Sequence, residues 1–134
     1  MLEFQGGASV DVAQPIAPGA LADLQRRLGS ATFAVISSDN PMSIDLGPRA
    51  NQLRRGVLAL ELRSAGHAHA PATGRSRDGS WSEQGFAVAI GPHDADAIAE
   101  LHEQRAYFWF DGERLWIHEV VGARRTIALP RATA

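Results

Sequence analysis

Apolar positions along the chain change repeatedly between the two-residue period of strands and the 3.6-residue period of helices. Apolar runs rich in aromatic and β-branched residues, bounded by turn residues, are typical of strands. Four such runs predict strands over residues 31–36, 67–73, 81–90 and 106–110. Asp111-Gly112 is a two-residue turn signal, so 114–120 is predicted to pair with the preceding aromatic strand in a hairpin. A last edge strand is expected over 125–129.

Stretches with helical spacing of apolar residues separate these strands. They predict helices over residues 18–28, 48–65 and 93–105. The second helix carries an apolar stripe of the kind that faces a core, at the spacing expected for one helix face. The stripe consists of Ala50, Leu53, Val57 and Leu60. In the third helix the predicted buried face consists of Ala95, Ile98 and Leu101.

After the first helix, the predicted order is strand, helix, strand, strand, helix, strand. This is the split βαβ order of the ferredoxin-like α+β sandwich, βαββαβ, here with an extra N-terminal helix and a C-terminal β-hairpin. Both crossover helices would cover one face of the sheet, which leaves the other face for the N-terminal segment, the extra helix, a partner or a ligand. Residues 1–17 are interpreted as an arm, either poorly ordered or an edge strand, and residues 18–134 as a single α+β domain.

Composition narrows the possible functions. The 134 residues include no cysteine, which excludes disulfides, a thiolate nucleophile and zinc-cysteine sites. The net charge of −2 argues against a general nucleic-acid binder. The N-terminus lacks the features of a signal peptide, and no apolar run approaches the roughly 20 residues of a membrane span. We therefore expect a cytoplasmic protein with no membrane association, and the Ala-, Arg- and Gly-rich composition suggests a bacterial one.

The central stretch, residues 66–90, gathers most of the candidate chemistry. Trp81 and Glu83 are two residues apart on a predicted strand, so both side chains point to one face. The indole ring of Trp81 could stack on a planar ligand ring, and the carboxylate of Glu83 could form hydrogen bonds to the edge of that ring. The alternative is a packing pair in which Glu83 bridges an arginine, as structural ion pairs often do.

Arg75 and Arg77 lie in a glycine-flanked loop of the same stretch. Guanidinium groups suit phosphate or carboxylate oxygens, so an anion site is one hypothesis and a solvated hairpin loop is the other. Neither glycine-rich nucleotide motif, G-x-x-x-x-G-K-[ST] or G-x-G-x-x-G, is present.

His67 and His69 have the spacing of two metal ligands on one strand face, with Glu83 as a conceivable third. A tight hairpin at Asp78-Gly79 would instead place His67 opposite Ile90, far from Glu83. We therefore predict neither a metal site nor a cofactor.

Several polar and glycine positions occur in an order that resembles a bacterial family, domain-of-unknown-function family 3293. They are Asn40-Pro41 with Ser43 beyond it, Asn51, Gly66, Gly74-Arg75, Trp81-Ser82-Glu83 and Gln104. The resemblance covers roughly residues 31–117 and departs from the family at Ser38-Asp39, where a threonine and a small or aromatic residue are common. It implies no agreed activity, only that these polar residues belong together.

Three functional hypotheses follow. The first is a domain, or an enzyme of unknown catalytic residues, that binds an anionic or planar small molecule such as a nucleotide-like, phosphate- or carboxylate-bearing ligand. Its ligand-binding residues would be Asn40, Asn51, Arg75, Arg77, Trp81 and Glu83. The second is a protein–protein interaction module or homodimer formed through the exposed sheet face. The third, which the charge disfavours, is a nucleic-acid binder that uses helix arginines.

Overall fold

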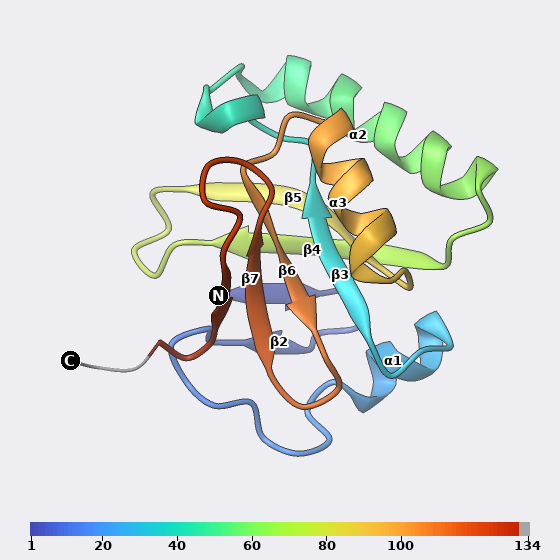
Figure 1. The fold of residues 1–134 in the computed structure, drawn as a ribbon, viewed down its shortest axis with the longest axis vertical. Helices are drawn as coiled ribbons and strands as arrows, with labels where there is room; N and C mark the ends of the chain where they lie inside the picture. The colour runs from blue at the N-terminus through green and yellow to red at the C-terminus, as the bar shows by residue number, and fades with distance from the viewer. Residues whose placement is uncertain (132–134) are drawn as a thin grey trace.

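The structure, a computed structural model, describes residues 1–131 as one antiparallel sheet with three α-helices (Figure 1). The last three residues of the predicted domain, 132–134, lie outside the described residues. The helices are α1 (Ala22–Leu28), α2 (Pro48–Ser64) and α3 (Pro92–Leu101). The strands are β1 (Leu2–Phe4), β2 (Ser9–Val10), β3 (Phe33–Ser37), β4 (His69–Arg75), β5 (Ser82–Val88), β6 (Ala106–Phe110), β7 (Leu115–Glu119) and β8 (Thr126–Ala128).

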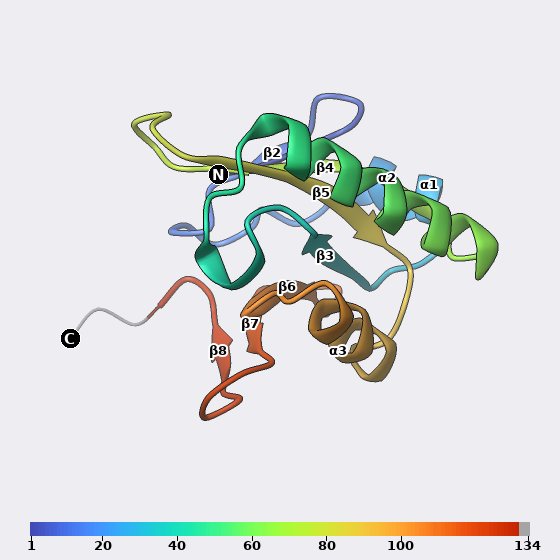
Figure 2. The same ribbon diagram turned by 90° about the horizontal axis from the view of Figure 1, so that it is seen from above.

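The eight strands follow the order β2-β1-β4-β5-β3-β6-β7-β8, and every neighbouring pair is antiparallel. The four long predicted strands are present, and β6 and β7 form the predicted hairpin, with Trp109 opposite Trp116. In Figure 1, β1, β4 and β5 run across the view whereas β3, β6 and β7 run along it, so the sheet is strongly curled. Seen from above in Figure 2, the two groups of strands form the arms of a half-barrel on either side of β3.

The ferredoxin-like prediction was wrong. The structure is a curled eight-stranded half-barrel, because β1 and β2 extend the sheet at one edge and β7 and β8 at the other. β1 and β2 are only three and two residues long, too short to give a readable two-residue period in the sequence. Their pairing depends on β4, about 70 residues away, with Leu2 opposite Gly74.

Gly85 marks the point where β5 comes closest to β3. A Cβ atom added to Gly85 would lie 2.2 Å from the carbonyl oxygen of Ile36 and 2.8 Å from the Cα of Ser37. No side chain can be accommodated at that distance, so glycine permits the close approach of the two backbones. Glycines at such positions let a sheet bend sharply, which is what the curl requires here.

The curl divides the apolar core into two clusters. The inner cluster lies between the concave face of the sheet and α1 with the N-terminal segment, and it includes Leu2, Phe4, Leu24, Phe33 and Phe110. The outer cluster lies under α2 and α3 and includes Ile36, Leu58, Leu62, Val88 and Ala95. Figure 2 shows α2 over β4 and β5, with α3 beside β6.

The predicted stripe of α2 does not face the core. Leu53, Val57 and Leu60 are 67%, 53% and 58% exposed, whereas Leu58, Leu62 and Asn51 are buried. The helix carries two apolar stripes, and the buried one includes the polar residues that contact the turn after β3. In α3, Ala95 is buried as expected, whereas Leu101 is exposed. Within the described residues, no helix has the length and apolar character needed to cross a membrane.

Candidate functional site

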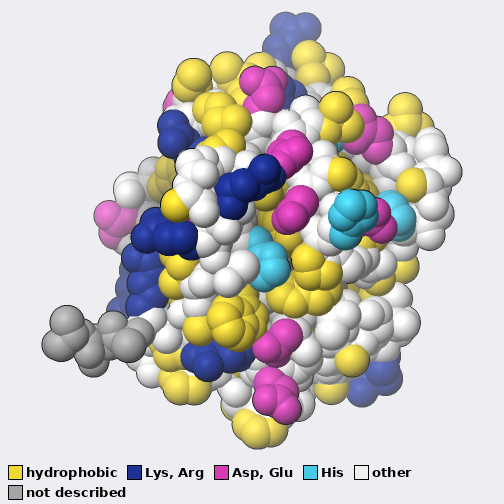
Figure 3. Space-filling model, in the orientation of Figure 1, with side chains coloured by type: hydrophobic (Ala, Val, Ile, Leu, Met, Phe, Trp, Pro, Cys, Tyr) yellow, Lys and Arg dark blue, Asp and Glu magenta, His cyan; other side chains and the backbone are white. Residues whose placement is uncertain are grey.

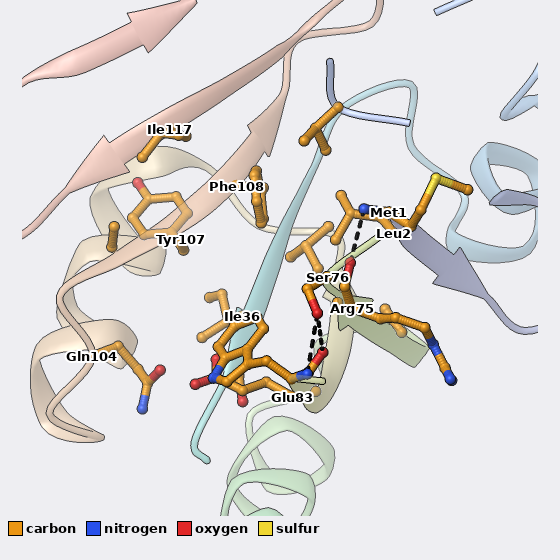
Figure 4. A pocket seen from close by; sticks show the side chains of 18 of the residues that line it. Met1, Leu2, Ile36, Arg75, Ser76, Glu83, Gln104, Tyr107, Phe108 and Ile117 are labelled. Atoms are coloured by element: carbon orange, nitrogen blue, oxygen red, sulfur yellow. Dashed lines mark hydrogen bonds between the residues drawn. The ribbon is translucent and has the colours of Figure 1, made fainter. Parts of the chain in front are cut away.

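The curl leaves a cleft of about 520 Å³ on the inner face of the sheet (Figure 4). Its walls come from β1, the β4–β5 hairpin, the end of β3, the β6–β7 hairpin and the segment after β2. Most of the lining is apolar, including Leu2, Val12, Val35, Ala72, Phe108 and Ile117. Polar side chains gather at one end, where Glu83 and Gln104 lie.

Asp39 joins the elements that surround this polar end. It is almost completely buried, and both of its carboxylate oxygens accept hydrogen bonds from Arg55 Nη1 at 2.9 Å. The backbone N–H of Gln84 donates to Asp39 Oδ2 at 3.0 Å, and the amide of Gln104 donates to the Asp39 carbonyl at 3.0 Å. Charge-assisted bonds are the strong ones, so the Asp39 carboxylate ties α2 and β5 to the end of β3. The carbonyl of the same residue adds the segment before β6.

Asn40 and Asn51 form a reciprocal pair beside Asp39. The side-chain amide of Asn51 donates to Asn40 Oδ1 at 2.8 Å, and the backbone N–H of Asn40 donates to Asn51 Oδ1 at 2.9 Å. Asn40, Met42 and Ser43 all have left-handed backbone conformations, with φ of 47°, 49° and 64°. Such residues cost on the order of 1–3 kcal/mol each and persist only where their surroundings hold them. The asparagine pair supplies part of that support.

Glu83 projects into the polar end of the cleft and is the most perturbed acid there. Its pKa is raised to about 7, chiefly by burial and also by the negative charge of Asp39, whereas hydrogen bonding to the Asn40 side chain opposes the shift. Near neutral pH, Glu83 therefore exists in both protonation states. Its carboxyl group can accept a hydrogen bond and, when protonated, also donate one.

Arg75 does not point toward Glu83. Cross-strand partners share a face, and Arg75 lies opposite Ser82 whereas Glu83 lies opposite Gly74, so the two side chains leave opposite faces of the hairpin. In Figure 4 the Arg75 guanidinium extends away from the labelled cleft residues. It forms an ion pair with Glu3, at 3.2 Å between Nε and Oε1.

Arg77 and Trp81 lie at the loop end of the cleft. Arg77 Nη2 is 2.7 Å from Asp11 Oδ2, an ion pair that joins the β4–β5 loop to the segment after β2. Trp81 lines the cleft and is half exposed. The structure thus brings Asn40, Asn51 and Glu83 together at one end, with Trp81 on the same cleft, and engages both predicted loop arginines in ion pairs.

Two residues that organise the polar end, Asp39 and Arg55, are not among the site residues that the sequence predicted. One signal was available: Arg55 follows Asn51 by four residues, so both side chains share a helix face. A face that carries Asn51 toward the turn must carry Arg55 there as well.

The histidine pair does not converge with Glu83. The register places His69 opposite Val88, five residue pairs along the hairpin from Glu83, and His69 Nδ1 lies 2.8 Å from the His67 carbonyl oxygen. Across residues 1–131, no cluster of three or more His, Asp or Glu side chains suited to a metal ion occurs.

Comparison with known proteins gives one match. The sequence model of a family described as "Protein of unknown function (DUF3293)" matches residues 36–107, more than half of the chain. This span contains the ordered polar residues on which the resemblance was based, from Asn40 to Gln104. No curated protein and no solved structure matches the chain.

Proposed function

The chain belongs to the DUF3293 family of proteins of unknown function, and we propose that the cleft of this member binds a small planar molecule. The edge of that molecule would carry adjacent hydrogen-bond donor and acceptor groups, as the edge of a nucleobase does. The observation that supports this proposal is the position of one carboxyl group, Glu83, at the polar end of an otherwise apolar cleft.

The size and lining of the cleft support a small ligand. A volume of about 520 Å³ falls within the roughly 300–1,000 Å³ range of small-molecule sites, which are mostly apolar with a few placed polar groups. A flat ring would be accommodated between Phe108 and Leu2, which line opposite walls (Figure 4). A carboxyl group that can both donate and accept hydrogen bonds would then distinguish ligands by the arrangement of donors and acceptors along their edge.

An anionic ligand has less support than a planar one. Arg75 and Arg77 are already paired with Glu3 and Asp11, so an incoming anion would have to displace a carboxylate. Glu83 and Asp39 add negative charge at the polar end, which opposes the binding of an anionic ligand there.

Binding can be tested by calorimetric titration with adenine, guanine, cytosine and uracil, with inorganic phosphate and benzoate as anionic probes. We expect at least one base to bind. Glu83→Leu should abolish this binding, whereas Glu83→Gln should keep it and remove its dependence on pH between 5 and 8, because an amide donates and accepts at every pH. Binding of phosphate or benzoate alone, lost in Arg75→Ala, would favour the anion site instead. No binding by any probe would contradict the proposal.

A further inference from the structure

We propose that the outer face of α2 is a docking surface for an acidic amphipathic helix of a partner protein. The surface, here called the α2 stripe, consists of Leu53, Val57 and Leu60. All three are more than half exposed on a helix whose opposite side is packed on the sheet. In Figure 3, apolar side chains gather along the upper part of the molecule, where Figure 1 places α2. Exposed apolar residues that adjoin one another on a monomer mark interaction sites.

The spacing within the stripe is that of a helix–helix seam. Successive members are four and three residues apart, the a/d spacing of knobs-into-holes packing. At 100° per residue, the three side chains fall within an arc of about 60°, the narrow seam of a coiled coil. Ile44 and Leu46, exposed in the segment just before α2, provide further apolar surface near its N-terminal end.

Charge indicates what kind of helix would dock. Arg49 and Arg63 are both exposed and, at 100° per residue, lie on the same flank of the stripe, roughly 21 Å apart along the helix. Neither takes part in an ion pair within residues 1–131. A partner helix with acidic residues along the facing flank would pair with both, which sets its orientation and register.

A second copy of the chain fits this surface less well. Two copies of α2 packed antiparallel about a two-fold axis would place Leu53 opposite Leu60. The same symmetry would bring Arg49 beside Arg63 of the second copy, twice, on one side of the interface. Like charges placed face to face disfavour that complex, whereas an acidic partner turns the same residues into attractive contacts.

A lipid surface is also a poorer match. Interfacial helices carry a broad apolar face with aromatic residues and basic residues flanking it. The α2 stripe is narrow and has no aromatic member, and its unpaired arginines lie on one flank only.

Gly56 supports the close approach of another helix. It lies mid-helix between Arg49 and Arg63 on the basic flank, and a Cβ atom added to it would have no heavy atom within 4 Å. Glycine here costs about 1 kcal/mol of helix stability relative to alanine, and no contact within the described chain requires it. A glycine beside the seam would let a partner backbone approach more closely than a larger side chain allows.

The test uses fluorescence anisotropy with a labelled 21-residue amphipathic helical peptide that has leucine at its a and d positions and glutamate on one flank. Its twin carries lysine at the same flank. We expect the full chain to bind the acidic peptide and not its twin. Leu53→Gln with Val57→Gln should weaken binding about tenfold or more. The double variant Arg49→Glu with Arg63→Glu should bind the lysine peptide in preference to the acidic one. Arg26→Glu on α1 should leave the affinity for both peptides unchanged.

Gly56→Leu distinguishes a surface that requires close packing of a partner helix from one that binds through apolar area alone. It adds apolar area and removes a helix-destabilising glycine, so thermal stability should hold or rise while peptide binding weakens. Tighter binding by this variant would overturn the proposal. So would equal affinity for the two peptides, a dimer in sedimentation velocity that Leu53→Gln dissociates, or binding only to anionic phosphatidylglycerol vesicles.

Discussion

The two ends of the cleft use the same pair of residue types to opposite effect. At the polar end, Arg55 and Asp39 lie 2.9 Å apart with side chains 22% and 5% exposed. At the loop end, Arg77 and Asp11 lie 2.7 Å apart with side chains 67% and 29% exposed. The distances are nearly equal, so burial rather than distance decides what each pair does. The buried pair fixes Glu83 and the asparagine turn, whereas the exposed pair can separate at little cost and admit a ligand.

The largest effect is expected from breaking the buried pair. Asp39→Ala leaves Arg55 without its carboxylate partner and the N–H of Gln84 without an acceptor. Loss of one partner of a buried ion pair costs about 3 kcal/mol, the lower end of the usual range because Arg55 keeps some solvent access. Urea denaturation monitored by tryptophan fluorescence would measure the change. Arg77→Ala is the matched control, and an equal loss in both variants would show that burial does not separate the two ends.

A smaller loss is expected from removing the asparagine pair. Asn51→Ala deletes both hydrogen bonds to Asn40 and leaves a left-handed residue less well held. We expect a loss of about 2 kcal/mol of unfolding free energy, since partly buried donors and acceptors are left unpaired. Gln52→Ala, at the neighbouring exposed position of α2, should have no measurable effect. Equal stability of the two variants would mean that the turn holds its shape unaided.

Glu83 should make the free energy of unfolding depend on pH by about 1 kcal/mol. Its pKa is about 7 in the folded chain and near the ordinary 4.5 when unfolded, so between these values the folded state binds more protons. Stability should therefore fall as pH rises from 4.5 to 7, and the magnitude is reduced because the side chain keeps solvent access. The difference in unfolding free energy between Glu83→Gln and the native chain should grow over that window. A constant difference would place the carboxyl in an ordinary aqueous environment.

The features that the sequence predicted are local ones. The β6–β7 hairpin follows from Asp111-Gly112, and α2 and α3 begin within one residue of their predicted starts, at Pro48 and Pro92. The curl was not predictable from periodicity, because it depends on Gly85 meeting the backbone of a strand about 50 residues away. Neither was the buried face of α2, since two apolar stripes with the same period compete and long-range polar contacts decide between them.

The candidate site likewise has features that the sequence predicted and features that depend on long-range pairing. The ordered polar residues of the family resemblance predicted that Asn40 and Asn51 belong with Glu83, and the structure places them together. The expectation that Arg75 shares a ligand site with Glu83 depended on the hairpin register, which a loop of small polar residues leaves open in the sequence. One residue of register decides which face a side chain occupies, and here it directs Arg75 toward Glu3.

The smallest effect, and the sharpest comparison, comes from the exposed pair. Arg77→Ala and Asp11→Ala should each change the unfolding free energy by no more than about 0.5 kcal/mol, because Arg77 is largely solvated in the folded chain and Asp11 keeps some solvent access. A double-mutant cycle should give a coupling energy of the same size that disappears in 1 M NaCl, where the screening length is about 3 Å. The cycle for Asp39 and Arg55 should give a larger coupling that persists in salt, since the buried pair is shielded from counterions. If the Arg77–Asp11 coupling persisted in salt at the larger value, the loop end would be as firmly closed as the polar end, and ligand entry would require another route.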